Sequence, residues 1–283
     1  MIPLEQYGEF ETAWCPGCGN FAINKALKKA LSMLDLAPHK VLVCSGIGQA
    51  AKSPHYLRCN CFNGLHGRSL PPAQGAALAN TEVAVFAESG DGCSYGEGGN
   101  HFLAAMRRNV TMTYLVHDNQ IYGLTKGQAS PTTAQGQPTK FQPAGVASMA
   151  FNPIAVAVTM DTPFVARGYA AEVDHLADLI VQAARHPGFA LVDILQPCVS
   201  FNKVNTYAWY KARCYKLGAD YDPTDRNAAM LKAQEFGDRI PIGVIYKGTR
   251  APYEGRIDSR VRRPLATSKP DMAKLASMLE SYA

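Results

Sequence analysis

The sequence predicts an α/β fold in which a mostly parallel sheet carries helices on both faces. Two observations lead to this prediction. Short apolar runs alternate with amphipathic stretches of helical period between residues 20 and 195, and the apolar runs end in glycine-rich or polar turns. Strands that alternate with helices form βαβ units, whose strands all end at one edge of the sheet.

The first expected helix covers residues 21–34. Its apolar residues recur at helical spacing, so one side faces the core: Ile23, Ala26, Leu27, Ala30, Leu31 and Leu34. Asn20 precedes them and can cap the first turn. The further expected helices cover residues 72–79, 98–106, 173–184, 226–237 and 271–279.

Buried strands are expected where short apolar runs end in turns, at residues 40–44, 83–87, 112–117 and 190–195. Two more apolar runs, at 154–158 and 164–166, continue the alternation.

Residues 123–145 are polar and predict a long functional loop, because compact domains seldom tolerate structureless stretches of this length. We expect residues 1–200 to form one domain. Residues 201–283, with a basic segment at 256–263, would form a C-terminal extension.

The composition is that of an ordinary globular protein. The 283 residues are 47% hydrophobic and carry a net charge of +5, and the mean hydropathy is -0.12. The charge is modest and dispersed, so nucleic-acid binding is not expected. No apolar run approaches the roughly 18 residues that span a bilayer, and no signal-peptide pattern opens the sequence. We therefore expect a cytoplasmic protein without membrane contact.

The most informative polar residues follow two neighbouring expected strands. Gly90-Asp91-Gly92 ends one strand, and Asn119 ends the next. A carboxylate and an amide that meet at one sheet edge suit Mg²⁺, which usually keeps phosphate ligands as well. Glycines let the backbone approach a phosphate, and a helix starting near residues 95–99 would aim free N–H groups at it. Because such a triplet alone is typical of turns, the matching Asn119 carries the prediction.

This spacing resembles the signature of enzymes that bind thiamine diphosphate through Mg²⁺. The resemblance implies that the side chains of Asp91 and Asn119 and the carbonyl of Ile121 ligate the metal. Asp118 replaces the first of the usual two asparagines and leaves the ligand in place. Further residues expected to contact the cofactor are Gly46, Ile47, Gly48, His66, Gly90, Gly92, Cys93, Tyr122, Gly123, Leu124 and Thr125.

The chain has eight cysteines and no export signal, which argues against structural disulfides. Cys15 and Cys18 form a C-x-x-C pair, which is half of a site for zinc or for an iron–sulfur cluster. The pair is superficially similar to a thioredoxin motif, but no strand precedes it. The residues alone favour a cluster only slightly, so a structural zinc module stays open as an alternative.

Longer motifs resemble the beta subunit of the 2-oxoacid:ferredoxin oxidoreductases over nearly the whole chain. The motifs are Cys15-Pro-Gly-Cys18-Gly, Ser45-Gly-Ile-Gly48, Leu65-His-Gly-Arg68, His101-Phe102 with Arg107-Arg-Asn109, Tyr122-Gly-Leu-Thr-Lys-Gly-Gln-Ala-Ser-Pro-Thr132, Gln196-Pro-Cys198 and Asp222-Pro-Thr-Asp-Arg226. The fold implied is the diphosphate-binding half of a thiamine diphosphate enzyme.

The resemblance implies one [4Fe–4S] cluster held by Cys15, Cys18 and Cys198. The fourth cysteine is implied in the segment after Gly-Ile-Gly, and where some family members place it directly after that motif this chain has Gln49. Cys59 is the best substitute in the same loop. The further candidates are Cys61 and Cys44. If none of them reaches the iron, the cluster has three cysteine ligands, is labile or is absent.

The activity implied is the coenzyme A-dependent oxidative decarboxylation of a 2-oxoacid to an acyl-CoA and CO₂, with electrons passing through the cluster to ferredoxin. Thiamine diphosphate acts as the electron sink. His66 is expected at the reaction centre. Lys52 and Lys126 are expected to bind the substrate carboxylate, which slightly favours 2-oxoglutarate.

An alpha subunit is implied as a partner, because the pyrimidine-binding domain and its glutamate are missing from this chain. We expect a hetero-oligomer in which the C-terminal extension packs on the same domain or on the partner, and a chain that is inactive alone. A non-redox thiamine-dependent decarboxylase or synthase subunit is the alternative.

Overall fold

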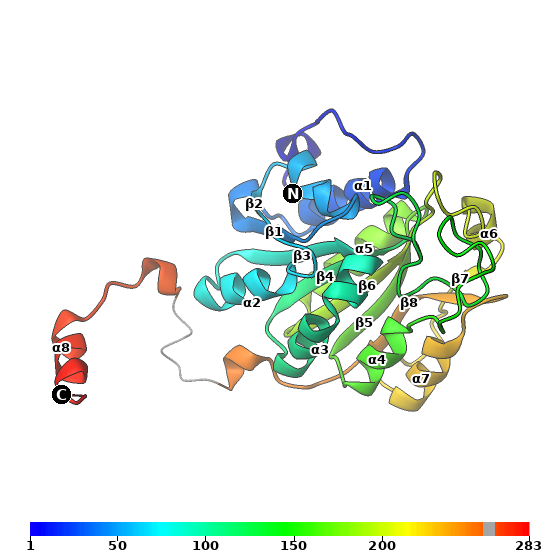
Figure 1. The fold of residues 1–283 in the computed structure, drawn as a ribbon. Helices are drawn as coiled ribbons and strands as arrows, with labels where there is room; N and C mark the ends of the chain where they lie inside the picture. The colour runs from blue at the N-terminus through cyan, green and yellow to red at the C-terminus, as the bar shows by residue number, and fades with distance from the viewer. Residues whose placement is uncertain (257–263, 283) are drawn as a thin grey trace.

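The computed structural model describes residues 1–256 and 264–282. A single eight-stranded sheet forms its centre, in the order β2-β1-β3-β4-β6-β5-β8-β7 (Figure 1). The strands are β1 Val41–Ser45, β2 Asn60–Asn63, β3 Ala84–Gly90, β4 Met112–Asp118, β5 Phe164–Tyr169, β6 Phe189–Leu195, β7 Cys214–Lys216 and β8 Ile240–Lys247. Neighbouring strands are parallel except β5 and β8. The predicted fold class is confirmed.

Helices cover both faces of the sheet (Figure 1). They are α1 Gly19–Met33, α2 Leu70–Ala79, α3 Gly99–Arg108, α4 Pro153–Thr159, α5 Val173–Arg185, α6 Tyr207–Lys211, α7 Arg226–Gln234 and α8 Met272–Glu280. Helices α1 and α5 share one apolar core with the sheet, and α2, α3, α4 and α7 share the other. Burial of the strands on both faces explains why their sequences are continuously apolar.

Short helical turns connect several of these elements. The 3-10 turns are Leu4–Tyr7, Pro38–Lys40, Ala50–Tyr56, Tyr253–Gly255 and Leu265–Thr267, and a π-helix covers Gly92–Glu97. Among the described residues, no helix is both long enough and apolar enough to cross a membrane.

The apolar run at 154–158 is the helix α4. The side chain of Asn152 accepts a hydrogen bond from the Ala155 amide at 3.0 Å, and Pro153 occupies the first turn, which together favour a helix start. The run at 164–166 lies in β5.

Three of the eight strands, β2, β7 and β8, lie outside the ranges predicted from the sequence. Strand β2 is exposed throughout and has no apolar pattern that would mark it. Strand β8, from the expected C-terminal extension, pairs with β5 and continues the sheet. The basic segment lies outside the described residues except for Arg256.

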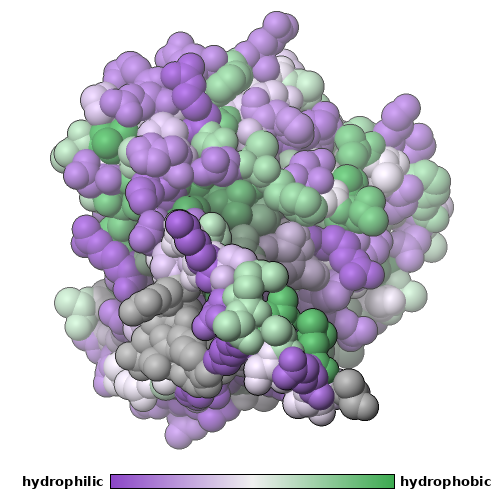
Figure 2. All heavy atoms as spheres, turned by 90° about the vertical axis from the view of Figure 1, so that its left-hand side faces the viewer, coloured by the Kyte–Doolittle hydropathy of each residue, from purple (hydrophilic) through white to green (hydrophobic). Residues whose placement is uncertain are grey.

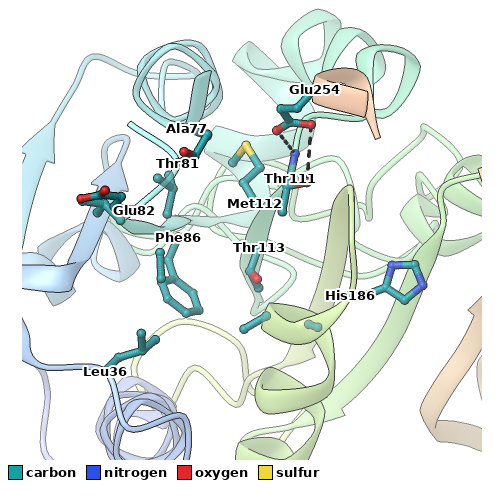
Figure 3. A pocket seen from close by; sticks show the side chains of 15 residues that line it. Leu36, Ala77, Thr81, Glu82, Phe86, Thr111, Met112, Thr113, His186 and Glu254 are labelled. Atoms are coloured by element: carbon teal, nitrogen blue, oxygen red, sulfur yellow. Dashed lines mark hydrogen bonds between the residues drawn. The ribbon is translucent and has the colours of Figure 1, made fainter. Parts of the chain in front are cut away.

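A cavity of about 450 Å³ lies at the amino ends of β3 and β4 (Figure 3). Glu254 reaches its rim and accepts a hydrogen bond from the Thr111 amide at 2.8 Å. Figure 2 looks onto this side of the molecule, where hydrophobic residues surround a hollow among hydrophilic ones. Ligands of open α/β sheets bind at the carboxyl ends of the strands, so the functional site is expected at the opposite edge.

Candidate functional site

One cavity at the carboxyl edge of the sheet collects the residues expected to contact the cofactor. It is lined by Ile47, Gly48, Gln49, Ala50, His66, Gly90, Asp91, Gly92, Cys93, Asn119, Ile121, Tyr122, Gly123, Leu124 and Thr125. Of the expected set only Gly46 is missing from this lining. The parallel register of β3 and β4 pairs Gly90 with His117, and therefore brings Asp91 and Asn119 to the same edge.

Asp91 lies at the bottom of this cavity and is only 1% exposed. Its Oδ2 atom accepts a hydrogen bond from the Thr132 hydroxyl at 2.6 Å. Burial raises the pKa of Asp91, while hydrogen bonds from Ser130 and Thr132 counteract the effect. A buried carboxylate at a cavity is suited to a cation, which would replace the lost hydration.

Asn119 forms a tight turn with the residues that follow it. Its side-chain oxygen accepts a hydrogen bond from the Ile121 amide at 3.1 Å, and Gln120 between them has a φ of 58°, in the left-handed region. Asparagine side chains commonly support such turns. The turn places Asn119 and Ile121 on the wall that also contains Asp91.

The π-helix Gly92–Glu97 begins directly after Asp91, several residues before the expected helix start. Tyr122 packs against its glycines. A Cβ atom at Gly92 would lie 2.3 Å from the Tyr122 ring, and one at Gly96 would lie 2.5 Å from the Tyr122 hydroxyl. The glycines are therefore required for this loop to close on Tyr122.

Cys93 holds two of the loops around the cavity. Its buried sulfur accepts hydrogen bonds from the amides of Gly67, at 3.1 Å, and of Ile47, at 3.4 Å. A Cβ atom at Gly46 would lie 2.6 Å from the same sulfur. Gly46 therefore contributes to the site by letting its loop approach Cys93.

His66 lies on the cavity wall beside an acidic residue. Its Nδ1 atom is 3.0 Å from Glu97 Oε2, and the Tyr122 hydroxyl lies 3.2 Å from the same oxygen. The imidazole is half-buried. Because the imidazole lines the cavity and lies beside the Glu97 carboxylate, it is placed to contact a bound ligand.

The structure does not place Lys52 or Lys126 on the cavity wall. Lys52 lies in the 3-10 turn Ala50–Tyr56, two residues after the lining residue Ala50. Lys126 lies next to Thr125 in an exposed turn, where its φ is 71°.

A second cavity brings together three of the four cysteines expected to hold iron. It is lined by Trp14, Cys15, Cys18, Asn20, Gln49, Asn119, Gly123, Gln196, Cys198, Val199, Ser200 and Phe201. Cys18 precedes the first turn of α1, where the helix favours negative charge. Burial raises the pKa of the Cys18 thiol to about 11, and neighbouring Cys198 and Cys15 add to this effect. A metal ion at this position would lower the pKa of the Cys18 thiol, because metal-bound thiols lose their protons.

Cys59 is absent from this cavity. Cys59 is half-buried and packs against the core that α1 and α5 share with the sheet. The thiols next to it are those of Cys61 and Cys44. Gln49 occupies the cavity wall instead, and its side-chain Oε1 is buried with no hydrogen-bond partner among the described residues. Within residues 1–256 and 264–282, no group of three or more His, Cys, Asp or Glu side chains is arranged as a ready metal site.

The two cavities share part of their walls. Gln49, Asn119 and Gly123 line both. Asn119, an expected Mg²⁺ ligand, therefore separates the cysteine cavity from the cavity of Asp91. A redox centre in one cavity would lie directly beside a cofactor in the other.

Further buried ionisable side chains lie close to Asp91 in the neighbouring strands β4 and β6. Tyr95 donates a hydrogen bond to Asp193 at 2.6 Å. Burial raises the pKa of Asp193 to about 6, while Tyr95 and Arg167 partly offset this. Burial also raises the pKa of Asp118 well above its usual value, and the nearby Asp193 and Asp91 raise it further.

Several residues of the site were missed in the sequence. Thr132 bridges Asp91 and Asp118, and Gln196 and Asn20 lie in the cysteine cavity. Thr132 and Gln196 both belong to motifs that carry the family resemblance, which was the available signal. Nothing in the local pattern indicated which atoms they contact.

The family described as thiamine pyrophosphate enzyme, C-terminal TPP binding domain, matches residues 43–194. The C-terminal family of the pyruvate ferredoxin oxidoreductase beta subunit matches residues 198–260. The first match covers the strands and turns that build the cavity of Asp91, and the second begins at Cys198.

Proteins with similar sequences are named as subunits of oxidoreductases of the same kind. A 2-oxoacid:ferredoxin oxidoreductase subunit beta of Sulfolobus sp is 46% identical over 258 residues, or 86% of this chain and 85% of the relative. One from Aeropyrum pernix is 44% identical over 87% of this chain and 81% of its own length. The 2-oxoglutarate oxidoreductase subunit KorB of Mycobacterium tuberculosis is 41% identical over 68% of this chain and 52% of that protein.

A solved structure shares the fold over almost its full length. It is a 2-oxoglutarate:ferredoxin oxidoreductase from Magnetococcus marinus with 2-oxoglutarate, coenzyme A and succinyl-CoA bound. The TM-score is 0.90 at 33% sequence identity, and the match covers 98% of this chain and 96% of the other. Together with the cavity geometry, these similarities confirm the resemblance seen in the sequence: the chain belongs to the beta subunits of the 2-oxoacid:ferredoxin oxidoreductases.

Proposed function

We propose that this beta subunit binds thiamine diphosphate through Mg²⁺ in the cavity of Asp91, and a [4Fe–4S] cluster in the cavity of Cys18. With an alpha subunit it would oxidatively decarboxylate a 2-oxoacid to an acyl-CoA and CO₂ and pass the electrons to ferredoxin. The observation that carries the proposal is the wall common to the two cavities, formed by Gln49, Asn119 and Gly123.

The donor atoms around Asp91 fit Mg²⁺. A carboxylate oxygen of Asp91, the amide oxygen of Asn119 and the backbone carbonyl of Ile121 are hard oxygen ligands, and Mg²⁺ completes its shell with phosphate oxygens and water. The π-helix that starts at Gly92 presents amides beside the same position. These free N–H groups would bind the diphosphate.

The chemistry of the reaction comes from the thiazolium ring, which takes up the electron pair released when CO₂ leaves. The chain's own residues bind and orient. His66, which lies beside Glu97, lines the cavity in which the 2-oxoacid would react. Lys52 and Lys126 remain predictions as partners of the substrate carboxylate. Each lies one or two residues from the lining, and a shift of its loop would bring it to the opening.

The cysteine cavity fits an iron–sulfur cluster better than zinc. Its three thiols come from two distant segments, with Cys15 and Cys18 from one and Cys198 from the other. The polar side chain of Gln49 stands on the wall where relatives are expected to have a cysteine. Cys59, the fourth ligand proposed from the sequence, would reach the iron only if the segment around it moved. We therefore propose a cluster with three cysteine ligands, Cys15, Cys18 and Cys198.

The alpha subunit would contribute the pyrimidine-binding domain and its glutamate, so the active form is a hetero-oligomer. Cys15 is exposed, so the cysteine cavity lies near the surface, where ferredoxin could dock. For the substrate we favour 2-oxoglutarate. Several relatives are named for it, and the solved neighbour contains 2-oxoglutarate, coenzyme A and succinyl-CoA.

Anaerobic co-purification with the alpha subunit tests the proposal. We expect four iron and four sulfide per beta subunit, together with one thiamine diphosphate. If one iron is lost, three iron and four sulfide remain. Oxoacid-dependent ferredoxin reduction should be highest with 2-oxoglutarate in a panel with pyruvate and branched-chain oxoacids. Thiamine diphosphate without iron would favour the non-redox decarboxylase, and zinc without thiamine would favour a structural metal module. Either result would contradict the proposal.

A further inference from the structure

A line of buried polar side chains leads from the cysteine cavity into the centre of the sheet. The Gln196 amide nitrogen lies 3.5 Å from the Cys18 sulfur and 2.8 Å from Asn20 Oδ1. His117 Nδ1 lies 2.8 Å from the same Asn20 oxygen. Its Nε2 lies 2.8 Å from Glu88 Oε1. Apart from Cys18, which is half-buried, these side chains are almost completely buried.

The hydrogen bonds along this line direct the amide nitrogen of Gln196 toward Asn20 and Cys18. The Oδ1 atom of Asn20 can only accept, so both His117 Nδ1 and Gln196 Nε2 donate to it. An amide nitrogen carries two protons, and the second one of Gln196 is directed at the Cys18 sulfur. If the amide of Gln196 were reversed, its carbonyl oxygen would face Asn20 Oδ1, which is an acceptor, and the Cys18 sulfur, which as a cluster-bound thiolate has no proton to donate.

Packing holds Gln196 in this place. A Cβ atom at Gly19 would lie 2.5 Å from Gln196 Cγ, so a glycine is needed where Gln196 lies against the start of α1. The Gln196 backbone amide donates to the Asp118 carbonyl at 2.9 Å, in line with the pairing of β4 and β6. The side chain therefore has little freedom to turn away from Cys18.

The carbonyl oxygen of Gln196 has no hydrogen-bond partner among the described residues, although it is buried. An unpaired buried polar atom is unfavourable, and an apolar side chain of similar volume would avoid it. A glutamine at this position is thus poorly explained by packing alone. The group that distinguishes glutamine from such an apolar side chain is the N–H that faces the Cys18 sulfur.

We propose that Gln196 is a positioning residue that donates an N–H···S hydrogen bond to Cys18 and thereby raises the reduction potential of the cluster. The inference rests on the proposed function, since it requires the cluster. Reduction adds negative charge to the cluster and its sulfur ligands, and a donor aimed at one of those sulfurs stabilises the added charge. Asn20 keeps the donor oriented.

The test is an EPR-monitored redox titration of the cluster in the anaerobically purified complex with the alpha subunit. In the Gln196→Leu variant we expect the iron content of the unsubstituted complex and a more negative midpoint potential. Loss of one hydrogen bond to a charged group should favour the oxidised cluster roughly tenfold. For a one-electron couple that is about 59 mV. Gln74→Leu is the matched control, because Gln74 is also buried but lies in α2, outside both site cavities.

A second variant, Asn20→Leu, keeps Gln196 but removes the acceptor that orients it, and should shift the potential in the same direction. If Gln196→Leu fails to retain iron, the Asn20→Leu shift decides: a negative shift supports the inference and an unchanged potential overturns it. An unchanged potential in Gln196→Leu with full iron content overturns this inference alone. A complex that contains no iron before any substitution overturns the proposed function as well.

Discussion

The hydroxyl oxygen of Thr132 lies 2.6 Å from Asp91 Oδ2, although the two residues are 41 positions apart in the chain. The same oxygen lies 2.7 Å from Asp118 Oδ1. A hydroxyl has one proton to donate, so one of the two carboxyl groups must itself be protonated. Burial and two neighbouring carboxylates raise the pKa of Asp118 well above its usual value. We infer that Asp118 donates to Thr132 and that Thr132 donates to Asp91, which keeps the negative charge for the metal.

Thr132→Val should therefore weaken Mg²⁺ binding without removing a metal ligand. Valine has nearly the same shape but leaves Asp91 and Asp118 without the bridging hydroxyl. Residues that orient metal ligands typically contribute 10- to 100-fold in affinity. Titration of Mg²⁺ in the presence of thiamine diphosphate, followed by calorimetry, measures the change. Thr159→Val on the exposed side of α4 is the control. Equal affinity in both variants would show that the bridge does not position Asp91.

Asp91→Ala should abolish the binding of thiamine diphosphate and Mg²⁺ while the fold is kept. The carboxylate is the charged ligand of the proposed site, whereas its burial is unfavourable for the metal-free protein. Thiamine quantification after gel filtration, with circular dichroism to check folding, measures both effects. Asp174→Ala removes an exposed carboxylate that pairs with Lys29, and it should leave cofactor content unchanged. Full cofactor occupancy in Asp91→Ala would defeat the assignment.

Cys15→Ser should remove most of the iron from the anaerobically purified complex and leave the fold intact. Cys15 is exposed and belongs to the cysteine cavity, so its loss breaks ligation without disturbing the core. Cys59→Ser tests the fourth ligand. Since Cys59 lies outside that cavity, we expect this variant to retain its iron in a colorimetric assay. Iron loss in Cys59→Ser would show that its segment moves to complete the cluster, and unchanged iron in Cys15→Ser would reject Cys15 as a ligand.

The metal-free protein should lose stability as the pH rises from about 4 to 6. The pKa of Asp193 is raised from 3.8 in the unfolded chain to about 6 in the folded one, so the folded state binds more protons in this window. Excess proton binding by the folded state means that the free energy of unfolding falls with rising pH. The contribution of this group is up to about 3 kcal/mol. Urea unfolding at a series of pH values measures it.

Asp193→Asn should flatten this pH dependence, because asparagine still accepts the hydrogen bond from Tyr95 but does not titrate. An identical slope in Asp193→Asn would assign the pH dependence to other groups. Excess Mg²⁺ and thiamine diphosphate should add more stability as the pH rises, because the metal binds the charged form of Asp91 and burial raises the pKa of this group.

The sequence by itself determined where the strands end and which residues stand at those ends. Apolar runs and glycine turns are local, and parallel strands bring successive carboxyl ends to one edge, so Asp91 and Asn119 could be placed together from the sequence. The pair Cys15 and Cys18 was likewise visible from spacing alone. The strands β2, β7 and β8 were not predicted: β2 is exposed and β7 has only three residues, whereas β8 is a buried apolar run whose signal was available in the sequence.

Only the tertiary structure decided which distant side chains share a hydrogen bond. Thr132 meets Asp91 because the loop after β4 folds back under the π-helix, and Gln196 meets Cys18 across 178 positions because β6 ends beside the start of α1. It also separated Cys59 from Cys15, Cys18 and Cys198, although the sequence placed it in the same loop as Gln49. Such contacts depend on how strands and helices pack, and a residue pattern records the period of each element but not the distance between two of them.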